Sequence, residues 1–439
     1  MKIKVIGAGL AGCEAAYYLA EHGSKVALYD IKPKRFTPAH KSRNFGELVC
    51  SNSLKGRDAY SNACGLLKEE MRILGSLTME AAAHAEVPAG GALAVDRERF
   101  SQYITARILK HPNIETFCEE VSSVPRDLSI VATGPLTTDA LSSDISSICG
   151  GQLHFYDASA PIVSRESIDF EHCFAGDRYG KGGDDYLNCP ISKEEYERFV
   201  DELLNAECAE LHDFDKREIF EGCMPVEVMA SRGRDSLRFA MLKPVGLKDE
   251  NGRKYYAVLQ LRKENLSGEA YNLVGFQTNL KFVEQKRVFS MIPALKNAEF
   301  LRYGVMHRNT FINSPACLNG DFSLKSKPNV FFAGQITGVE GYVESAASGI
   351  LAAIHMLKRL SGADTILPPE TTVTGALSRH ISGANSNFQP MNANFGILPP
   401  PEKPIRDKKA RYAYLAERAL NDIRKFKITC DSGANPKEE

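Results

Sequence analysis

Tryptophan is absent from this chain of 439 residues, and so are closely spaced cysteine pairs, long apolar runs and an excess of charge of one sign. The missing tryptophan excludes no class of fold. None of the eleven cysteines stands in Cys-x-x-Cys spacing, which argues against a structural zinc site, so we expect no metal. The most apolar late stretch, residues 343–360, carries Glu344 and Lys358 and is too short to span a bilayer.

No apolar signal segment precedes the first predicted strand, and the number of cysteines is odd. Both features favour a reducing compartment, so we expect a cytoplasmic protein without membrane association. The length exceeds the size at which one hydrophobic core usually stops growing, and we therefore expect two domains.

The net charge is −1, from 54 Lys and Arg against 55 Asp and Glu. Binding of nucleic acid would therefore need a local basic surface. Residues 402–427 offer one, with nine Lys or Arg against four Asp or Glu, interleaved with Tyr412, Tyr414 and Phe426. Two interpretations remain open: a surface for nucleic acid, or a solvated helix that packs its aromatic residues on the body of the protein.

The first 30 residues predict a dinucleotide-binding unit. An apolar strand is followed by glycines in G-x-G-x-x-G spacing, then by a helix, a second strand and an acid 18 residues after the last glycine. The glycines let the turn close and let the backbone approach a pyrophosphate at the helix start, while the acid takes the ribose hydroxyls. We expect cofactor contacts from Gly7, Ala8, Gly9, Leu10, Ala11, Gly12 and Asp30.

Two later segments, residues 128–134 and 329–338, are predicted strands of the same domain, and a helix is expected to begin near Val343. Only one G-x-G-x-x-G motif follows a strand, so one dinucleotide is expected. A late strand that returns to the cofactor is typical of a two-part flavin domain, which favours FAD over NAD. Further cofactor contacts are expected from Thr133, Gly134, Gly334, Gly338, Glu340, Gly341 and Tyr342.

The predicted fold is α/β: an FAD-binding Rossmann-like domain interrupted by an inserted α+β domain. We expect residues 1–155 and 300–375 to form the FAD-binding domain, residues 156–299 the insertion, and residues 376–439 a partly basic C-terminal extension. The spacing of Leu67, Met71 and Leu74 predicts a helix that packs one apolar face. After Thr371 the Asn, Pro and Gly content predicts an irregular connection through Pro404.

Several strings in the chain are specific enough to indicate a family. They are ELVCSNSL (47–54), GLLKEEM (65–71), VPAGGALAVDR (87–97), GDDYLNCP (183–190), FEGCMPVEVMA (220–230), YNLVGFQTNLK (271–281), YGVMHRNTFINSP (303–315) and FFAGQITGVEGYVESAASG (331–349). With these residues the chain resembles the folate- and FAD-dependent tRNA (uracil-5-)-methyltransferases, the TrmFO family, from residue 1 to about 400. It is also similar to the GidA/MnmG flavoproteins, so the expected FAD-binding domain is of the GidA type.

The resemblance implies methylation of carbon 5 of the T-loop uridine, position 54, of tRNA. It implies 5,10-methylenetetrahydrofolate as carbon donor, NAD(P)H as the source of the hydride and FAD as the carrier between them. The two functional cysteines of the family fall on Cys50 and Cys223, and its folate-stacking histidine falls on His307.

Carbon 5 of uracil becomes nucleophilic only after a thiolate adds to carbon 6, and the carbon-5 proton must later leave. Two cysteines can divide these roles, and we expect Cys223 to attack with Cys50 as its partner. Three other functions remain open. These are the same chemistry on ribosomal RNA, an RNA-independent flavoprotein oxidoreductase, and a non-catalytic flavoprotein that binds RNA.

Overall fold

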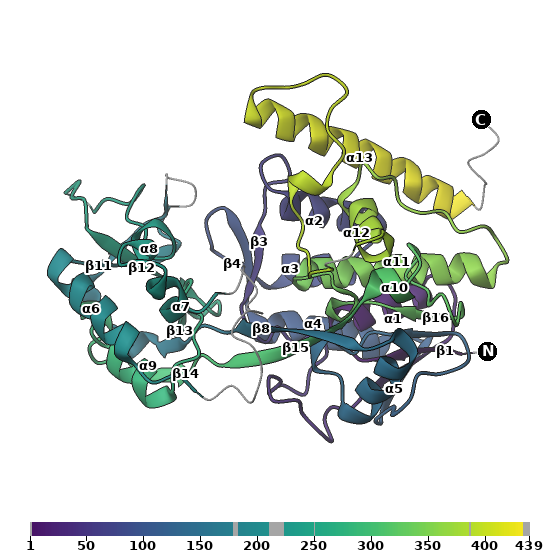
Figure 1. Ribbon diagram of the computed structural model, residues 1–439, viewed down its shortest axis with the longest axis horizontal. Coiled ribbons are helices and arrows are strands. Elements are labelled where there is room, and N and C mark those ends of the chain that lie inside the picture. Colours follow the sequence, from purple (N-terminus) through teal and green to yellow (C-terminus); the bar gives the residue numbers. More distant parts are fainter. Residues whose placement is uncertain (1, 179–182, 210–223, 250, 386–387, 433–439) are drawn as a thin grey trace.

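The computed structural model describes residues 2–178, 183–209, 224–249, 251–385 and 388–432. Two bodies, each with its own buried hydrophobic core, lie at opposite ends of the molecule (Figure 1). A long antiparallel ribbon of β8 (Gln152–Ala158) and β15 (Met306–Ile312) runs from one body toward the other. Within the described residues, no helix is long and apolar enough to cross a membrane.

The larger body is built on a five-stranded sheet whose neighbouring strands are all parallel. Its order is β16 (Val330–Phe332), β7 (Ser129–Val131), β1 (Ile3–Ile6), β2 (Val26–Asp30) and β6 (Ile114–Cys118). Three of these strands, β1 (IKVI), β7 (SIV) and β16 (VFF), are short apolar runs, as expected where helices cover both faces of a parallel sheet. The predicted α/β fold with a Rossmann-like sheet is confirmed.

Two helices that begin at the carboxyl edge of this sheet pack against each other, α1 (Leu10–Glu21) and α11 (Tyr342–Leu360). The contact is close because α11 has Gly349 at the crossing, where a Cβ atom would lie 2.2 Å from the carbonyl oxygen of Ala11. The first turn of α1 therefore packs against α11 about two turns after α11 begins.

Further helices and a small sheet complete the larger body. They are α2 (Ala63–Leu74), α3 (Leu77–Ala85), α4 (Arg97–Lys110), α5 (Asp139–Cys149), α10 (Ser314–Cys317) and the strands β3 (Ser53–Gly56), β4 (Glu86–Val87) and β5 (Ala92–Val95). The predicted packing helix is confirmed as α2, because Leu67, Met71 and Leu74 are all buried.

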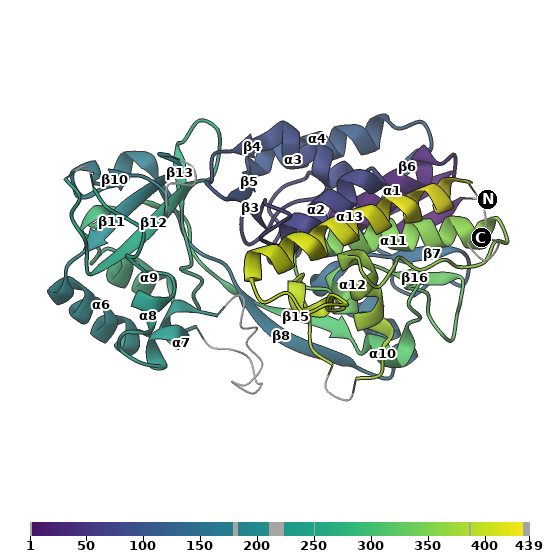
Figure 2. The ribbon, with the colours of Figure 1, turned by 90° about the horizontal axis from the view of Figure 1, so that it is seen from above.

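The smaller body is an antiparallel six-stranded sheet with helices gathered on one face (Figure 2). Its strands are β10 (Phe174–Ala175), β11 (Tyr186–Ile191), β12 (Ala257–Lys263), β13 (Ala270–Leu273), β9 (Ile162–Ser164) and β14 (Phe300–Arg302). Its helices are α6 (Lys193–Asn205), α7 (Val226–Ser231), α8 (Ser236–Phe239) and α9 (Phe282–Phe289). Residues 300–302, which the sequence analysis placed in the FAD-binding domain, pair with β9 of this sheet.

The region after Thr371 is less irregular than predicted, because α12 (Val373–Ser382) begins almost at once. The Thr372 side chain caps its N-terminus, and the buried carboxylate of Glu70 on α2 accepts the N–H groups of Val373 at 2.8 Å and Thr374 at 2.9 Å. The N-terminus of this helix is thus stabilised by a residue 303 positions away in the sequence. Local composition does not reveal such a contact.

The long helix α13 (Lys408–Ser432) crosses α2 on the outside of the larger body (Figure 1). Leu415, Ala419, Ile423 and Phe426 bury one stripe of it. Most of its basic residues remain exposed. The region therefore forms a helix that packs on the body of the protein, as one of the two interpretations predicts. Its charged face points to solvent and remains accessible to nucleic acid.

Candidate functional site

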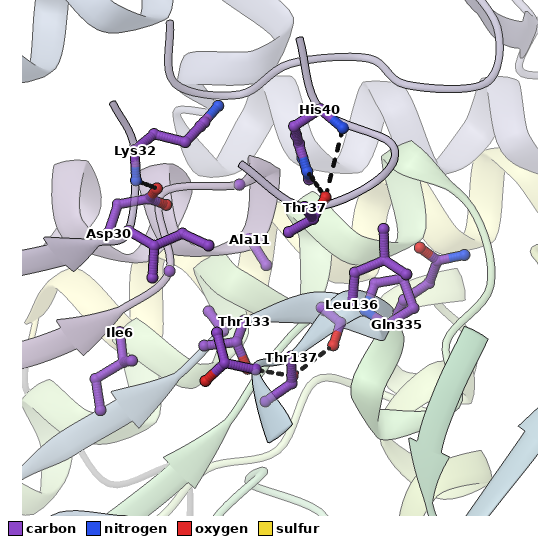
Figure 3. A pocket seen from close by; sticks show the side chains of 18 of the residues that line it. Ile6, Ala11, Asp30, Lys32, Thr37, His40, Thr133, Leu136, Thr137 and Gln335 are labelled. Carbon is purple, nitrogen blue, oxygen red and sulfur yellow. Dashed lines mark hydrogen bonds between the residues drawn. The ribbon is translucent and has the colours of Figure 1, made fainter. Parts of the chain in front are cut away.

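A cleft of about 1110 Å³, including open solvent at its mouth, lies at the carboxyl edge of the parallel sheet. Its lining includes residues at the ends of four different strands: 7 and 9–11 after β1, 30–32 at the end of β2, 132–138 after β7 and 334–335 after β16 (Figure 3). In open α/β sheets this edge is where ligands bind, because the loops that leave parallel strands meet there.

The glycine turn between β1 and α1 is closed so tightly that side chains are excluded. Gly7 has φ +97°, and a Cβ there would lie 2.5 Å from the oxygen of Ala132; a Cβ at Gly12 would lie 1.7 Å from the oxygen of Gly7. Gly9 differs, because a Cβ there would meet no atom within 4 Å. The backbone at Gly9, Leu10 and Ala11 therefore faces the open cleft.

The N-terminus of α1 at this turn is suited to an anion. Gly9 is its N-cap residue and supplies no capping side chain. The first N–H groups of a helix have no partner within the helix, and they carry the positive end of its dipole. A pyrophosphate fits such a site.

Asp30 closes the turn from β2. Its Oδ2 accepts the N–H of Ala8 at 2.7 Å and its Oδ1 accepts the N–H of Lys32 at 2.8 Å. A carboxylate has about four acceptor sites, so Asp30, which lines the cleft, retains capacity for the hydroxyls of a ribose. Across the cleft, Thr133 shares a hydrogen bond with Thr137 at 2.6 Å (Figure 3).

The cleft contains polar residues that the sequence analysis did not identify: Lys32, His40 and Glu47. Lys32 is 6% exposed, and its Nζ donates to the oxygen of Asn44 at 2.5 Å and lies 3.7 Å from Glu47 Oε2. That Oε2 is buried and has no hydrogen-bond partner among the described residues. Burial lowers the pKa of His40, whose Nδ1 is 2.6 Å from Thr37 Oγ1. These residues follow β2 in a segment without periodicity. Glu47 begins the string ELVCSNSL that carries the family resemblance, but nothing in the sequence assigned any of the three to the cleft.

The predicted cofactor residues are divided by the structure. Those that line the cleft are Gly7, Gly9, Leu10, Ala11, Asp30, Thr133, Gly134, Gly334 and Tyr342. Those that do not line it are Ala8, Gly12, Gly338, Glu340 and Gly341. Glu340 acts on the cleft indirectly, because both of its carboxylate oxygens accept from Gln335 Nε2, at 2.6 and 2.7 Å, and Gln335 lines the cleft.

Cys50 lies beside the cleft, at the N-terminus of α11. Its Sγ is 2.9 Å from the Oη of Tyr342, and the same oxygen accepts the N–H groups of Cys50 at 2.8 Å and Ser51 at 3.3 Å. Tyr342 and Val49 both line the cleft. Cys50 is thereby held next to the wall that Tyr342 forms.

Three arginines from two bodies hold the loop that carries Cys50. Arg97, at the start of α4, donates to the oxygen of Leu48 at 2.9 Å. Arg302, in β14, donates to the oxygen of Val49 at 2.5 Å. Arg262, in β12, donates to Asn52 Oδ1 at 2.6 Å. The smaller body thus reaches into the neighbourhood of the cleft through two strands of its sheet.

The structure does not describe Cys223 or the side chain of His307, the other two predicted site residues. Cys223 lies outside the described residues. His307 stands in β15, where its backbone is opposite Asp157 of β8, and its side chain lies outside the described part of the chain. The joint action of Cys50, Cys223 and His307 therefore remains a prediction. Among the described residues, no group of three or more His, Cys, Asp or Glu side chains is arranged to hold a metal ion.

Comparison with known proteins shows the family. The family described as "Glucose inhibited division protein A", GIDA, matches residues 2–364. The methylenetetrahydrofolate–tRNA-(uracil-5-)-methyltransferase TrmFO of Acetivibrio thermocellus is 57% identical over 428 residues, which cover 97% of this chain and 98% of that protein. The TrmFO of Desulfitobacterium hafniense is 56% identical over 429 residues, with the same coverage.

The fold has a solved counterpart. The structure of Aquifex aeolicus GidA in its form II crystal superposes with a TM-score of 0.71 at 16% identity, covering 98% of this chain and 73% of that one. At this identity the likeness concerns the fold alone. The near full-length matches establish the rest: the chain belongs to the GidA family and, within it, to the TrmFO family of methylenetetrahydrofolate–tRNA-(uracil-5-)-methyltransferases.

Proposed function

We propose that this protein methylates carbon 5 of uridine 54 in the T-loop of tRNA, with 5,10-methylenetetrahydrofolate as carbon donor, FAD as cofactor and NAD(P)H as reductant. The family and the names of its members support this chemistry. The structural observation that carries it is the position of Cys50, whose Sγ lies 2.9 Å from a tyrosine that lines the dinucleotide cleft. A cytoplasmic location, where tRNA is found, is part of the proposal.

The residues of the cleft fit FAD. The turn at Gly7 and Gly9 and the start of α1 would hold the pyrophosphate, and Asp30 would hold the adenosine ribose. Gly334, Gln335 and Tyr342, at the start of α11, would face the isoalloxazine. Bound FAD supplies the electrons and carries the one-carbon unit between folate and uracil.

The cysteines supply what the flavin does not. A thiolate adds to carbon 6 of the uracil, which places charge on the ring and makes carbon 5 a nucleophile. A second group must then accept the proton that leaves carbon 5. We assign the attack to Cys223 and the second role to Cys50, and we assign His307 to stacking against the pterin.

The charge distribution on α13 supports an RNA partner. Five basic residues lie just before or in its first turn: Lys403, Arg406, Lys408, Lys409 and Arg411. Positive charge at a helix N-terminus is unfavourable because it opposes the helix dipole. Among the described residues, none of these five has a carboxylate oxygen within 4 Å, so no ion pair offsets this unfavourable positive charge. The phosphate groups of a bound RNA would neutralise this positive charge.

Two experiments test this proposal. Mass spectrometry of the protein mixed with a T-loop hairpin that carries 5-fluorouracil would identify the attacking residue, and a crosslink at Cys223 is expected. Labelled methylenetetrahydrofolate offered with tRNA and with ribosomal RNA should label tRNA. Label in ribosomal RNA alone, or NADH oxidation by a small acceptor with no labelled RNA, would favour the alternative functions and reject this one.

A further inference from the structure

Tyr342 connects the cleft with Cys50 through one oxygen atom. Its ring lines the cleft, and its Oη accepts two backbone N–H groups, from Cys50 at 2.8 Å and from Ser51 at 3.3 Å. A hydroxyl has one proton and two lone pairs. Because the two N–H groups occupy the lone pairs, the hydroxyl proton is the group left to meet Cys50 Sγ at 2.9 Å. Tyr342 is therefore oriented as a donor to the sulfur.

The proton of Tyr342 stays in place at physiological pH. Burial raises the pKa of Tyr342 well above its usual value, so the group remains an O–H donor across the range in which a cysteine ionises. An O–H donor favours the ionised form of its acceptor.

The charges around the Cys50 loop are mainly positive. The ionisable groups that face it come from four elements: Arg97 of α4, Arg262 of β12 with Glu264 just after it, Arg302 of β14 and Tyr342 of α11. Glu264 pairs with Arg97 at 2.8 Å. No carboxylate of the described residues lies within 4 Å of Arg262 or Arg302. Three guanidinium groups thus face one carboxylate, an environment that favours an anion.

We propose that Tyr342 is a positioning residue that holds Cys50 as a thiolate, by donating its hydroxyl proton to Sγ while Arg97 and Arg302 supply positive charge. The sequence predicts only a cofactor contact for Tyr342. The proposal rests on the proposed function for the use of this thiolate. It can accept the proton released from carbon 5, while the electron pair of the broken C–H bond stays on the ring.

The test is the pH dependence of Cys50 alkylation in the FAD-loaded protein. Iodoacetamide is applied from about pH 5 to about pH 10, and peptide mass spectrometry follows each cysteine. In Tyr342→Phe, the midpoint for Cys50 should move up by about one pH unit, which makes alkylation about tenfold slower at pH values well below the wild-type midpoint. Cys430 is the internal control, because it is half-buried and burial raises its pKa to about 11.

A second pair of variants separates charge from loop packing. Arg302→Met should also raise the Cys50 midpoint, whereas Arg302→Lys, which keeps the charge, should remain near the wild type. Arg287→Met on α9, whose guanidinium pairs with exposed carboxylates, should have no effect. If Tyr342→Phe does not fold or does not retain FAD, the two Arg302 variants still test whether positive charge beside the loop favours the Cys50 thiolate.

An unchanged midpoint in Tyr342→Phe would overturn the proposal. So would a wild-type Cys50 that reacts only at the high pH expected for Cys430, or an Arg302→Lys profile that matches Arg302→Met. The measurement needs neither folate nor tRNA. A protein that fails to methylate tRNA but shows the expected shifts would therefore reject the proposed function and leave the Tyr342–Cys50 pair in place.

Discussion

A methyl group at Gly12 is expected to break the turn on which the cleft is built. The new Cβ would lie 1.7 Å from the oxygen and 2.9 Å from the carbon of the Gly7 carbonyl. Contact between these atoms is tolerated only beyond 3.0 Å, so the peptide of Gly7 would have to move by more than 1 Å. Both partners are backbone, so no flexible side chain can move aside.

The size of the effect follows from the rigidity of the surroundings. Overpacking of a well-packed site costs about 1–3 kcal/mol, and in a body of this size each kcal/mol lowers Tm by about 2–4 °C. Gly12→Ala should therefore lose about 5 °C in Tm without FAD and should also fail to bind FAD. Differential scanning calorimetry and the flavin absorbance of the purified protein measure the two effects separately.

Gly9→Ala is the matched control, because it adds the same methyl group in the same turn. Gly9 has φ −73°, and a Cβ there meets nothing within 4 Å. The Tm without FAD should therefore stay within about 1 °C of the wild type. Since that methyl group would enter the space assigned to the pyrophosphate, saturating FAD should no longer add the roughly 2.7 kcal/mol that a ligand at 100 Kd supplies.

The pair of variants can refute the reasoning in two ways. A Gly12→Ala protein that melts with the wild type would show that the turn relaxes without cost. A Gly9→Ala protein that binds FAD with wild-type affinity would show that the pyrophosphate does not lie against the start of α1.

Three other perturbations have expected outcomes. Burial raises the pKa of Glu70 from 4.5 to about 7, so the folded protein holds this proton more tightly than the unfolded chain. The stabilisation from this proton is complete below about pH 4.5 and is lost as pH rises to about 7. Across this range the free energy of unfolding should fall by about 3 kcal/mol more in the wild type than in Glu70→Gln. Urea titrations at each pH measure this difference. Charge reversal of Lys408 and Lys409 to Glu should weaken tRNA binding and lower its salt slope by about two, measured by filter binding at several salt concentrations. Cys50→Ala and Cys223→Ala should each retain FAD yet lose methylation of a T-loop transcript.

Each of these has a result that would count against it. Parallel pH profiles for Glu70→Gln and the wild type would remove Glu70 as the titrating group. An unchanged salt slope, equal to that of a Lys193→Glu control on the exposed face of α6, would exclude α13 from the RNA interface. Methylation at the wild-type rate by either cysteine variant would end the role assigned to that cysteine.

The nucleotide turn could be predicted from the sequence because its physics is local. Gly7, Gly9, Gly12 and Asp30 stand within one strand–helix–strand unit, in which Gly12 meets the backbone of Gly7 and Gly9 meets open space. Only the close approach of Gly7 to Ala132 comes from a distant part of the chain. The apolar runs of β7 and β16 were also recognisable from the sequence, because buried parallel strands are nearly continuous in apolar residues. These features predicted the fold class and the kind of cofactor.

The start of α12 could not be predicted from local composition. The composition after Thr371 predicts a loop, but the carboxylate of Glu70, 303 positions earlier, accepts the N–H groups of that helix. Lys32 and Glu47 were not predicted as cleft residues for a related reason: although Glu47 begins the family string ELVCSNSL, the segment has no periodicity that would place it against the parallel sheet.

The sequence by itself determined the glycine turn, the parallel sheet and the identity of the cysteines that match the family. Only the tertiary structure decided what surrounds Cys50. Tyr342 stands 292 positions from it, and Arg97, Arg262 and Arg302 come from three different elements. Hydrogen bonds and charges act over a few ångströms in space, whatever the separation along the chain, so no spacing in the sequence encodes this group.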